Sequence, residues 1–120
     1  MLDHIGISVS NLTQAKAFFL SALAPLGIGV VMEWEQHVGL GDAGKPYFWI
    51  APGPVGSRLH IAFSAKNRAQ VDAFYAAAIK AGGRDNGAPG LRPHYHANYY
   101  GAFVLDADGH NIEAVCHLPE

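Results

Sequence analysis

The sequence predicts an α+β fold in which two paired βαβββ modules form a curved mixed or antiparallel sheet backed by helices. One observation is an internal repeat, offset by 56 residues, that relates positions 4–27 to 60–83. The other is the order of patterns in each half, where an alternating apolar run precedes an apolar stripe with helical spacing and three more strand-like runs. A chain of 120 residues suits one domain. We expect a single domain over 1–120, with module 1 at 1–55 and module 2 at 56–120.

The repeat keeps its order along the first strand and helix of each half. Nine of the twenty-four aligned positions are identical. They are His4/His60, Ile5/Ile61, Ser8/Ser64, Asn11/Asn67, Gln14/Gln70, Ala17/Ala73, Phe18/Phe74, Ala22/Ala78 and Gly27/Gly83. Composition alone does not explain so ordered a match, and the two halves are expected to share one structure.

Each copy contains a helix that begins at an asparagine. Asn11 and Asn67 are each followed three residues later by a glutamine. An asparagine oxygen at such a position accepts a hydrogen bond from an early backbone N–H, and the glutamine can reach back to the start of the helix. We predict helices over about 12–24 and 68–81.

Three strand-like runs follow each predicted helix. In the first half they lie at 30–35, 38–40 and 47–51, and in the second half at 83–96, 99–105 and 111–116. The tetrapeptide DADG at 106–109 is typical of a hairpin turn, because glycine accepts a positive φ. It lacks the later glutamate of a calcium loop.

The composition excludes several classes of protein. The net charge is −2 and no run of Lys or Arg occurs, so nucleic acid is not an expected partner. Charged residues make up 15% of the chain, against about 25% in typical domains, which favours additional burial in a homodimer. No apolar stretch reaches the roughly 18 residues of a membrane span, and the N-terminus does not resemble a signal peptide. We expect a cytoplasmic protein without membrane contact.

Two histidines and one glutamate are predicted to share one type of sheet face. Strand side chains alternate, so His4, Gly6 and Ser8 lie on one face, and His60 occupies the equivalent face of the second copy. Glu113 interrupts an apolar strand, where an ionised carboxylate needs a partner such as a cation. We predict a metal site of His4, His60 and Glu113 that binds Fe, Mn, Ni or Zn. The alternative is that the histidines are hydrogen-bonded core residues and the glutamate lies at the rim.

The stretch LRPHYHANYY concentrates polar and aromatic groups beside a Gly/Pro-rich loop. Arg92 is predicted to bind an anionic group of a small-molecule substrate and His94 to contact it. His94 or His96 is a candidate general base, and Tyr99 and Tyr100 are candidate donors to a developing oxyanion, beside Glu113. The alternatives are an aromatic surface hairpin or part of a dimer interface.

Aromatic residues of the first half are candidates for the same site. Trp49 and Phe48, with Trp34 and Tyr47, are predicted to line the hollow and to select planar, apolar ligands. The alternative is that they form ordinary core. No role is assigned to the histidines at 37, 110 and 117.

The sequence resembles the vicinal oxygen chelate superfamily, which includes glyoxalase I, extradiol dioxygenases, and fosfomycin- and bleomycin-resistance proteins. The resemblance lies in DHIGISV at 3–9, LHIAFSA at 59–65 and FVLDADGHNIEAV at 103–115. It implies His4, His60 and Glu113 as metal ligands. It also implies dimers whose metal sites draw on both chains. Substrates that chelate through vicinal oxygens, in lyase, isomerase, dioxygenase or thiol transferase reactions, are implied as well.

One departure from glyoxalase I is expected. That enzyme, which the chain resembles, generally uses a second acidic ligand from the first module. An offset of 65 residues places Phe48 opposite Glu113, with Trp49 one step away, and neither can bind a metal. We therefore expect a three-ligand site. The alternatives are a metal-free drug- or metabolite-binding protein, like the bleomycin-resistance relatives, and a regulatory subunit without enzymatic activity.

Overall fold

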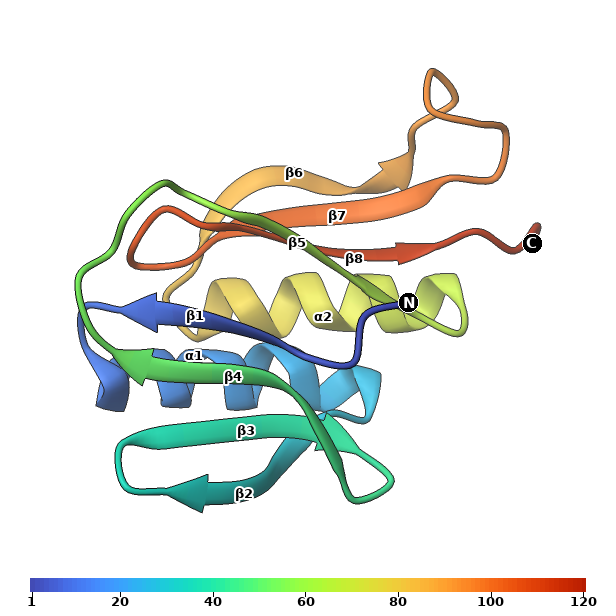
Figure 1. Ribbon diagram of the computed structural model, residues 1–120. Coiled ribbons are helices and arrows are strands. Elements are labelled where there is room, and N and C mark those ends of the chain that lie inside the picture. The colour runs from blue at the N-terminus through green and yellow to red at the C-terminus, as the bar shows by residue number, and fades with distance from the viewer.

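Two four-stranded sheets and two α-helices make up the computed structural model, which describes residues 1–120 (Figure 1). The first module contains β1 (Ile5–Val9), α1 (Leu12–Leu23), a short 3-10 helix (Ala24–Leu26), β2 (Gly29–Trp34), β3 (His37–Asp42) and β4 (Lys45–Pro52). The second contains β5 (His60–Ser64), α2 (Arg68–Lys80), β6 (Arg84–Leu91), β7 (Tyr100–Leu105) and β8 (Asn111–Cys116). The strand orders are β1-β4-β3-β2 and β5-β8-β7-β6. The predicted pair of βαβββ modules is confirmed.

Both helices begin at the predicted asparagines. The Asn11 side chain accepts from the backbone N–H of Gln14 at 3.0 Å, and Asn67 accepts from that of Gln70 at 2.8 Å. The Gln70 side chain in turn accepts from the backbone N–H of Lys66 at 2.8 Å. These bonds satisfy N–H groups that a helix start otherwise leaves free. Each helix ends one residue before its predicted end, and neither is long and apolar enough to cross a membrane.

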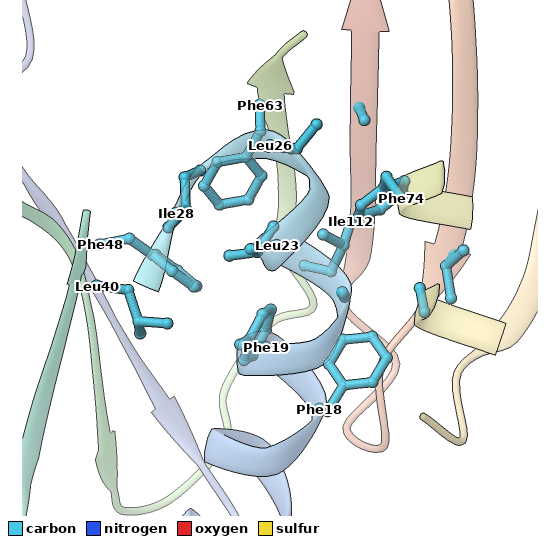
Figure 2. Close-up of a cluster of buried hydrophobic side chains, with 14 of the residues drawn as sticks. Phe18, Phe19, Leu23, Leu26, Ile28, Leu40, Phe48, Phe63, Phe74 and Ile112 are labelled. Atoms are coloured by element: carbon cyan, nitrogen blue, oxygen red, sulfur yellow. The ribbon is translucent and has the colours of Figure 1, made fainter. Parts of the chain in front are cut away.

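One hydrophobic core joins the two modules. It contains 21 buried residues drawn from both helices and both sheets. Figure 2 shows α1 with the first sheet on one side and strands of the second sheet on the other. Phe19 of α1 packs edge to face on Phe48 of β4, and Phe48 packs on Phe63 of β5, with ring centroids 5.0 and 5.4 Å apart. Each sheet therefore turns one face toward the helices; we call the opposite face its outer face.

Candidate metal and substrate site

Glu113 belongs to a row of residues that crosses the second sheet. The strand register places Ala62, Glu113, Phe103 and Gly87 side by side on β5, β8, β7 and β6. The residue before Glu113 on β8, Ile112, lies in the core. Because strand side chains alternate, Glu113 and Phe103 point to the outer face of the second sheet.

The Glu113 carboxylate is held by an imidazole and a phenol. His60 Nε2 lies 2.8 Å from Oε1, and the Tyr99 hydroxyl donates to Oε2. The Glu113 side chain is only 1% exposed, whereas that of His60 is 53% exposed. Burial, and then the bond to Glu113, raises the pKa of Tyr99, so its phenol stays protonated at neutral pH. No lysine or arginine pairs with Glu113, and a buried carboxylate without a cation is costly.

The glycine beside this carboxylate leaves room for it. A Cβ added to Gly101 of β7 would lie 3.1 Å from Oε2 of Glu113 and 3.2 Å from Cε1 of Tyr99. Few Cβ atoms in proteins make contacts this close. The absence of a side chain at Gly101 therefore leaves space for the hydrogen-bonded side chains of Glu113 and Tyr99, and a larger residue there would crowd them.

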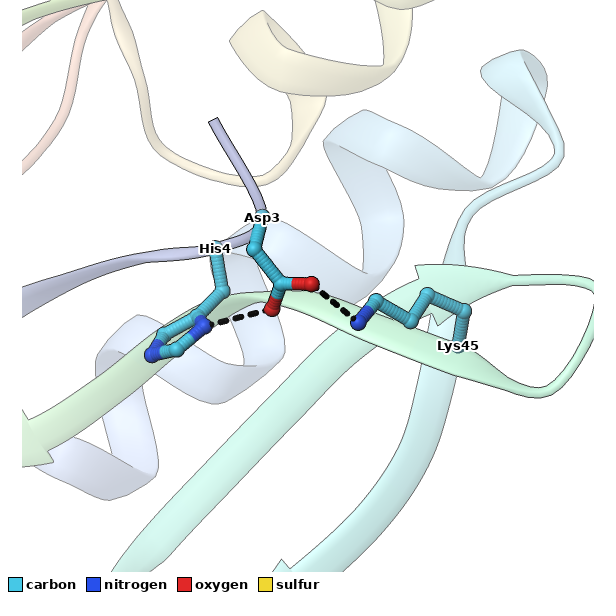
Figure 3. Close-up of polar contacts among 3 residues, drawn as sticks. All are labelled: Asp3, His4 and Lys45. Carbon is cyan, nitrogen blue, oxygen red and sulfur yellow. Dashed lines mark hydrogen bonds and ion pairs between the residues drawn. The ribbon is translucent and has the colours of Figure 1, made fainter. Parts of the chain in front are cut away.

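His4, just before β1, is oriented by a neighbour that sequence reasoning missed. Its Nδ1 lies 2.8 Å from a carboxylate oxygen of Asp3, whose other oxygen accepts from Lys45 Nζ at 2.8 Å (Figure 3). Lys45 foremost, and then His4, lowers the pKa of Asp3, so its carboxylate is ionised and accepts the Nδ1 proton. The Nε2 lone pair of a neutral His4 is then free. Metal-binding histidines characteristically donate their other ring N–H to a carboxylate in this way.

The three predicted metal ligands do not converge within one chain. His4 and His60 border the same cleft of about 640 Å³ between β1 and β5, but Glu113 does not line it. The ligand atoms of the three residues do not all lie within 4.8 Å of one another. The physical reason is that both helices lie between the two sheets, so the two outer faces do not face each other.

A different group of three side chains does meet that distance, in the turn between β7 and β8. Asp106, Asp108 and His110 place their ligand atoms within 4.8 Å and form a candidate metal-binding triad. Oxygens of both aspartates already accept hydrogen bonds from the protein, however. Asp106 Oδ1 accepts from the backbone N–H groups of the other two residues, and both oxygens of Asp108 accept from Ser10.

The tautomer of His110 decides whether this group fits an ion. Its Nδ1 accepts from the backbone N–H of Leu59 at 2.9 Å, so the neutral ring carries its proton on Nε2 and has no free lone pair. That buried Nε2 has no hydrogen-bond partner. The donor set therefore fits a structural turn better than a metal site.

The register of the first sheet corrects the expected equivalence between the modules. Gly6 pairs with Trp49, and Ala62 pairs with Glu113. Since the repeat aligns Gly6 with Ala62, Trp49 and not Phe48 occupies the position equivalent to Glu113. Trp49 lies over Gly39, whose added Cβ would be 2.8 Å from its ring, and borders an open hollow of about 570 Å³.

Two predicted site residues lie on the wrong side of their strands. Phe48 borders the cleft but has no exposed surface, and its ring packs on two other phenylalanines of the core. Tyr100 donates to Asp72 of α2 at 2.7 Å. Their immediate neighbours Trp49 and Tyr99 point outward, because adjacent strand side chains face opposite sides. Phe48 is a core residue, and Tyr100 is not part of the group around Glu113.

The structure also separates the two histidines of the PHYH segment. The His96 ring lies against Tyr99, with centroids 5.2 Å apart, and its Nε2 is 2.7 Å from Nδ1 of His117. His94 instead packs on Tyr95, with ring centroids 4.2 Å apart. Sequence reasoning missed His117, because nothing in its position at the end of β8 indicates a partner twenty-one residues earlier.

Arg92 reaches the outer face of the second sheet. Its guanidinium carbon lies 5.3 Å from the ring centroid of Phe103, the residue beside Glu113 in the cross-strand row. The outer face of the second sheet therefore carries His60, Glu113, Tyr99 and Arg92 together.

The fold and this group of residues define a paired-module protein with an open, partly charged sheet face. The model of the Glyoxalase/Bleomycin resistance protein/Dioxygenase superfamily matches residues 1–114, and the chain belongs to this superfamily. No curated protein matches the sequence significantly.

Solved structures share the fold along the whole chain. A glyoxalase/bleomycin resistance protein from Albidiferax ferrireducens T118 is 27% identical, with a TM-score of 0.85 over 98% of this chain and 99% of that one. A glyoxalase/bleomycin resistance protein/dioxygenase family enzyme from Burkholderia phytofirmans PsJN is 20% identical, with a TM-score of 0.74 over 97% and 98%. A glyoxalase I variant from Zea mays is 19% identical, with a TM-score of 0.70 over 95% of this chain and 46% of that one. The last two similarities concern the fold alone.

Proposed function

We propose that the protein is a divalent-metal-dependent enzyme acting on a small substrate that chelates the ion through two vicinal oxygens. The ligands are His60 and Glu113 of one protomer and His4 of a second copy, and Fe, Mn, Ni and Zn suit such a set. One observation carries this proposal: a fully buried carboxylate lies 2.8 Å from an imidazole nitrogen and has no Lys or Arg partner. A divalent ion offsets the desolvation of that carboxylate.

The spacing of these two groups suits a shared ion. Two ligand atoms that each lie about 2.1 Å from an ion, at right angles, are about 3.0 Å apart. His60 Nε2 and Glu113 Oε1 lie 2.8 Å apart. Without metal the pair is held by a hydrogen bond, and binding an ion releases the shared proton.

The third ligand is supplied by a second copy because the outer faces of one chain do not face each other. His4 is ready for this role, since Asp3 holds its Nδ1 proton and leaves Nε2 free. Several large apolar side chains also remain exposed, among them Met32, Trp34, Leu91 and Tyr95. Exposed apolar groups of this kind favour an interface between copies.

In the proposed reaction the metal ion and the side chains of the protein have different roles. When bound, a divalent ion polarises an oxygen pair and stabilises negative charge that develops on it. Tyr99 fixes the Glu113 carboxylate by its hydrogen bond. His96, in contact with the Tyr99 ring, is the candidate proton acceptor, and its contact with His117 stabilises a proton shared between the two rings.

The number of carboxylates limits the reactions. Trp49 stands where a second acidic ligand would lie, so the site has one carboxylate, Glu113. We infer that a reaction that requires two carboxylates, as in glyoxalase I, is disfavoured. Dioxygenase, lyase and thiol transferase reactions need only the three-ligand set.

A metal-free binding protein is the second candidate function. It is favoured by the hollow on the first sheet, where Trp34, stacked on His37, and Trp49 offer aromatic surface to a planar ligand. Ligand affinity that is unchanged by a chelator and by His60→Ala would support this function.

The first test is elemental analysis of the protein after reconstitution with each of the four ions. About one ion per chain is expected, and it should be lost in His60→Ala. Mixing tests the shared site: His4→Ala and Glu113→Ala chains are each expected to lose the ion, whereas refolding them together should restore one intact site per heterodimer. Failure to restore it, with wild-type loading normal, would refute a site shared between chains. Wild-type protein that retains no ion would refute the metal-dependent function.

A further inference from the structure

The guanidinium of Arg92 is held by backbone carbonyl groups of β6, next to two glycines that leave room for it. Nη1 donates to the carbonyl of Gly90 and Nη2 to that of Ala88, each at 2.8 Å. A Cβ added to Gly87 would lie 3.1 Å from Nη2, and one added to Gly90 would lie 3.2 Å from Nη1. Side chains at these two positions would therefore crowd the guanidinium. The backbone of β6 holds Arg92 in place before any ligand binds.

Arg92 has no counter-ion in the protein. No carboxylate oxygen lies within 4.0 Å of it. A guanidinium has five N–H groups, and only two of them donate to protein acceptors here, so three remain for a ligand. A half-buried, preorganised cation with free donors is well suited to binding a carboxylate or phosphate through two hydrogen bonds.

The position of Arg92 relative to Glu113 sets the size of such a ligand. Gly87, beside Nη2, is two strands from Glu113 in the cross-strand row, which corresponds to about 10 Å between backbones. The Phe103 ring lies between them, 5.3 Å from the guanidinium carbon. A molecule that spans this gap places an apolar or planar segment over Phe103.

We propose that Arg92 is an anion-binding subsite, and that the substrate is a small acid whose anionic group is separated by a planar or apolar segment from its two chelating oxygens. The position of those oxygens rests on the proposed metal-dependent function. Charge supports this class of substrate: a divalent ion with Glu113 and Arg92 leaves a net positive charge on this face, which attracts an anion.

The test compares two ligands that differ only in charge. 3,4-Dihydroxybenzoate and its neutral amide share the ring and the vicinal oxygens. Their affinities are measured by calorimetry on zinc-loaded and metal-free protein, for the wild type, for Arg92→Gln and for Arg84→Gln. The last is a matched control that removes the same charge from an exposed site at the far end of β6. Zinc is redox-inactive, and zinc content is determined on the same samples.

The wild type is expected to bind the acid at least about tenfold more tightly than the amide, as a charge-assisted pair of hydrogen bonds gives. Arg92→Gln should abolish that ratio, keep the affinity for the amide and keep its zinc, while Arg84→Gln behaves as wild type. Equal affinities for both ligands in zinc-loaded wild type would overturn the subsite and leave the metal site standing. If no zinc is retained, the metal-dependent function fails. The subsite is then decided on the metal-free protein: an acid preference that Arg92→Gln abolishes supports it, and no preference overturns it.

Discussion

Replacing Glu113 by glutamine should separate metal binding from folding. The glutamine carbonyl can still accept from the Tyr99 hydroxyl, and its amide can donate to His60, so both contacts of the buried side chain survive. The midpoint of thermal unfolding without metal is therefore expected to stay within a few degrees of wild type. Metal affinity is expected to fall, because one of the three proposed protein ligands is replaced by a neutral group.

The size of the effect follows from ligand linkage. A free ion at 100 times its dissociation constant stabilises the native state by about 2.7 kcal/mol. With an unfolding entropy of about 2.1 cal/mol/K per residue, the 120 residues give about 0.25 kcal/mol/K, so the wild-type midpoint should rise by about 11 °C. If the substitution weakens binding about 100-fold, only about 0.4 kcal/mol and about 2 °C remain.

Calorimetry with and without zinc measures both quantities at fixed protein concentration. The matched control is Glu35→Gln, an exposed glutamate in the turn between β2 and β3 that should keep the full wild-type increase. An equal metal-induced increase in Glu113→Gln and in wild type would refute Glu113 as a ligand. A large loss of midpoint without metal would instead show that the charge itself holds this site together.

Three further predictions test the register, the site and the turn. Phe48→Ala should lower the free energy of unfolding in urea by about 3–5 kcal/mol, and Trp49→Ala on the outer face by clearly less; equal losses would contradict the assignment of Phe48 to the core. Gly101→Ala should reduce zinc uptake with an unchanged far-UV spectrum, since its Cβ would lie 3.1 Å from Oε2 of Glu113, and full uptake would show that this carboxylate can shift. Burial raises the pKa of Asp106, so the folded state binds its proton more tightly and this residue's contribution to stability falls as pH rises through that raised pKa. Asp106→Asn keeps the acceptor oxygen, so its stability in urea should match wild type at low pH and exceed it near pH 7, and a wild-type advantage that grows with pH would show that the charge is paired.

The local part of the fold was predictable from the sequence. Side-chain spacing along a helix and hydrogen bonds within its first turn depend on residues three or four apart, so Asn11 and Asn67 locate both helix starts. The repeat predicts that the second module copies the first. The pairing of strands is less accessible: a shift of one residue exchanges the two faces of a strand, which is why Phe48 rather than Trp49 was matched with Glu113.

The sequence by itself determined the fold class and predicted that His4, His60 and Glu113 lie on one type of sheet face. That His60, and not His4, lies against Glu113 was decided by the structure. Only the tertiary structure decided which faces those residues share. The helices pack between the sheets and keep His4 apart from Glu113, because burying both apolar helix faces in one core stabilises this arrangement. The backbone arrangement that binds the Arg92 guanidinium likewise arises from irregular strand register around Gly87. This register depends on contacts between strands and not on local sequence.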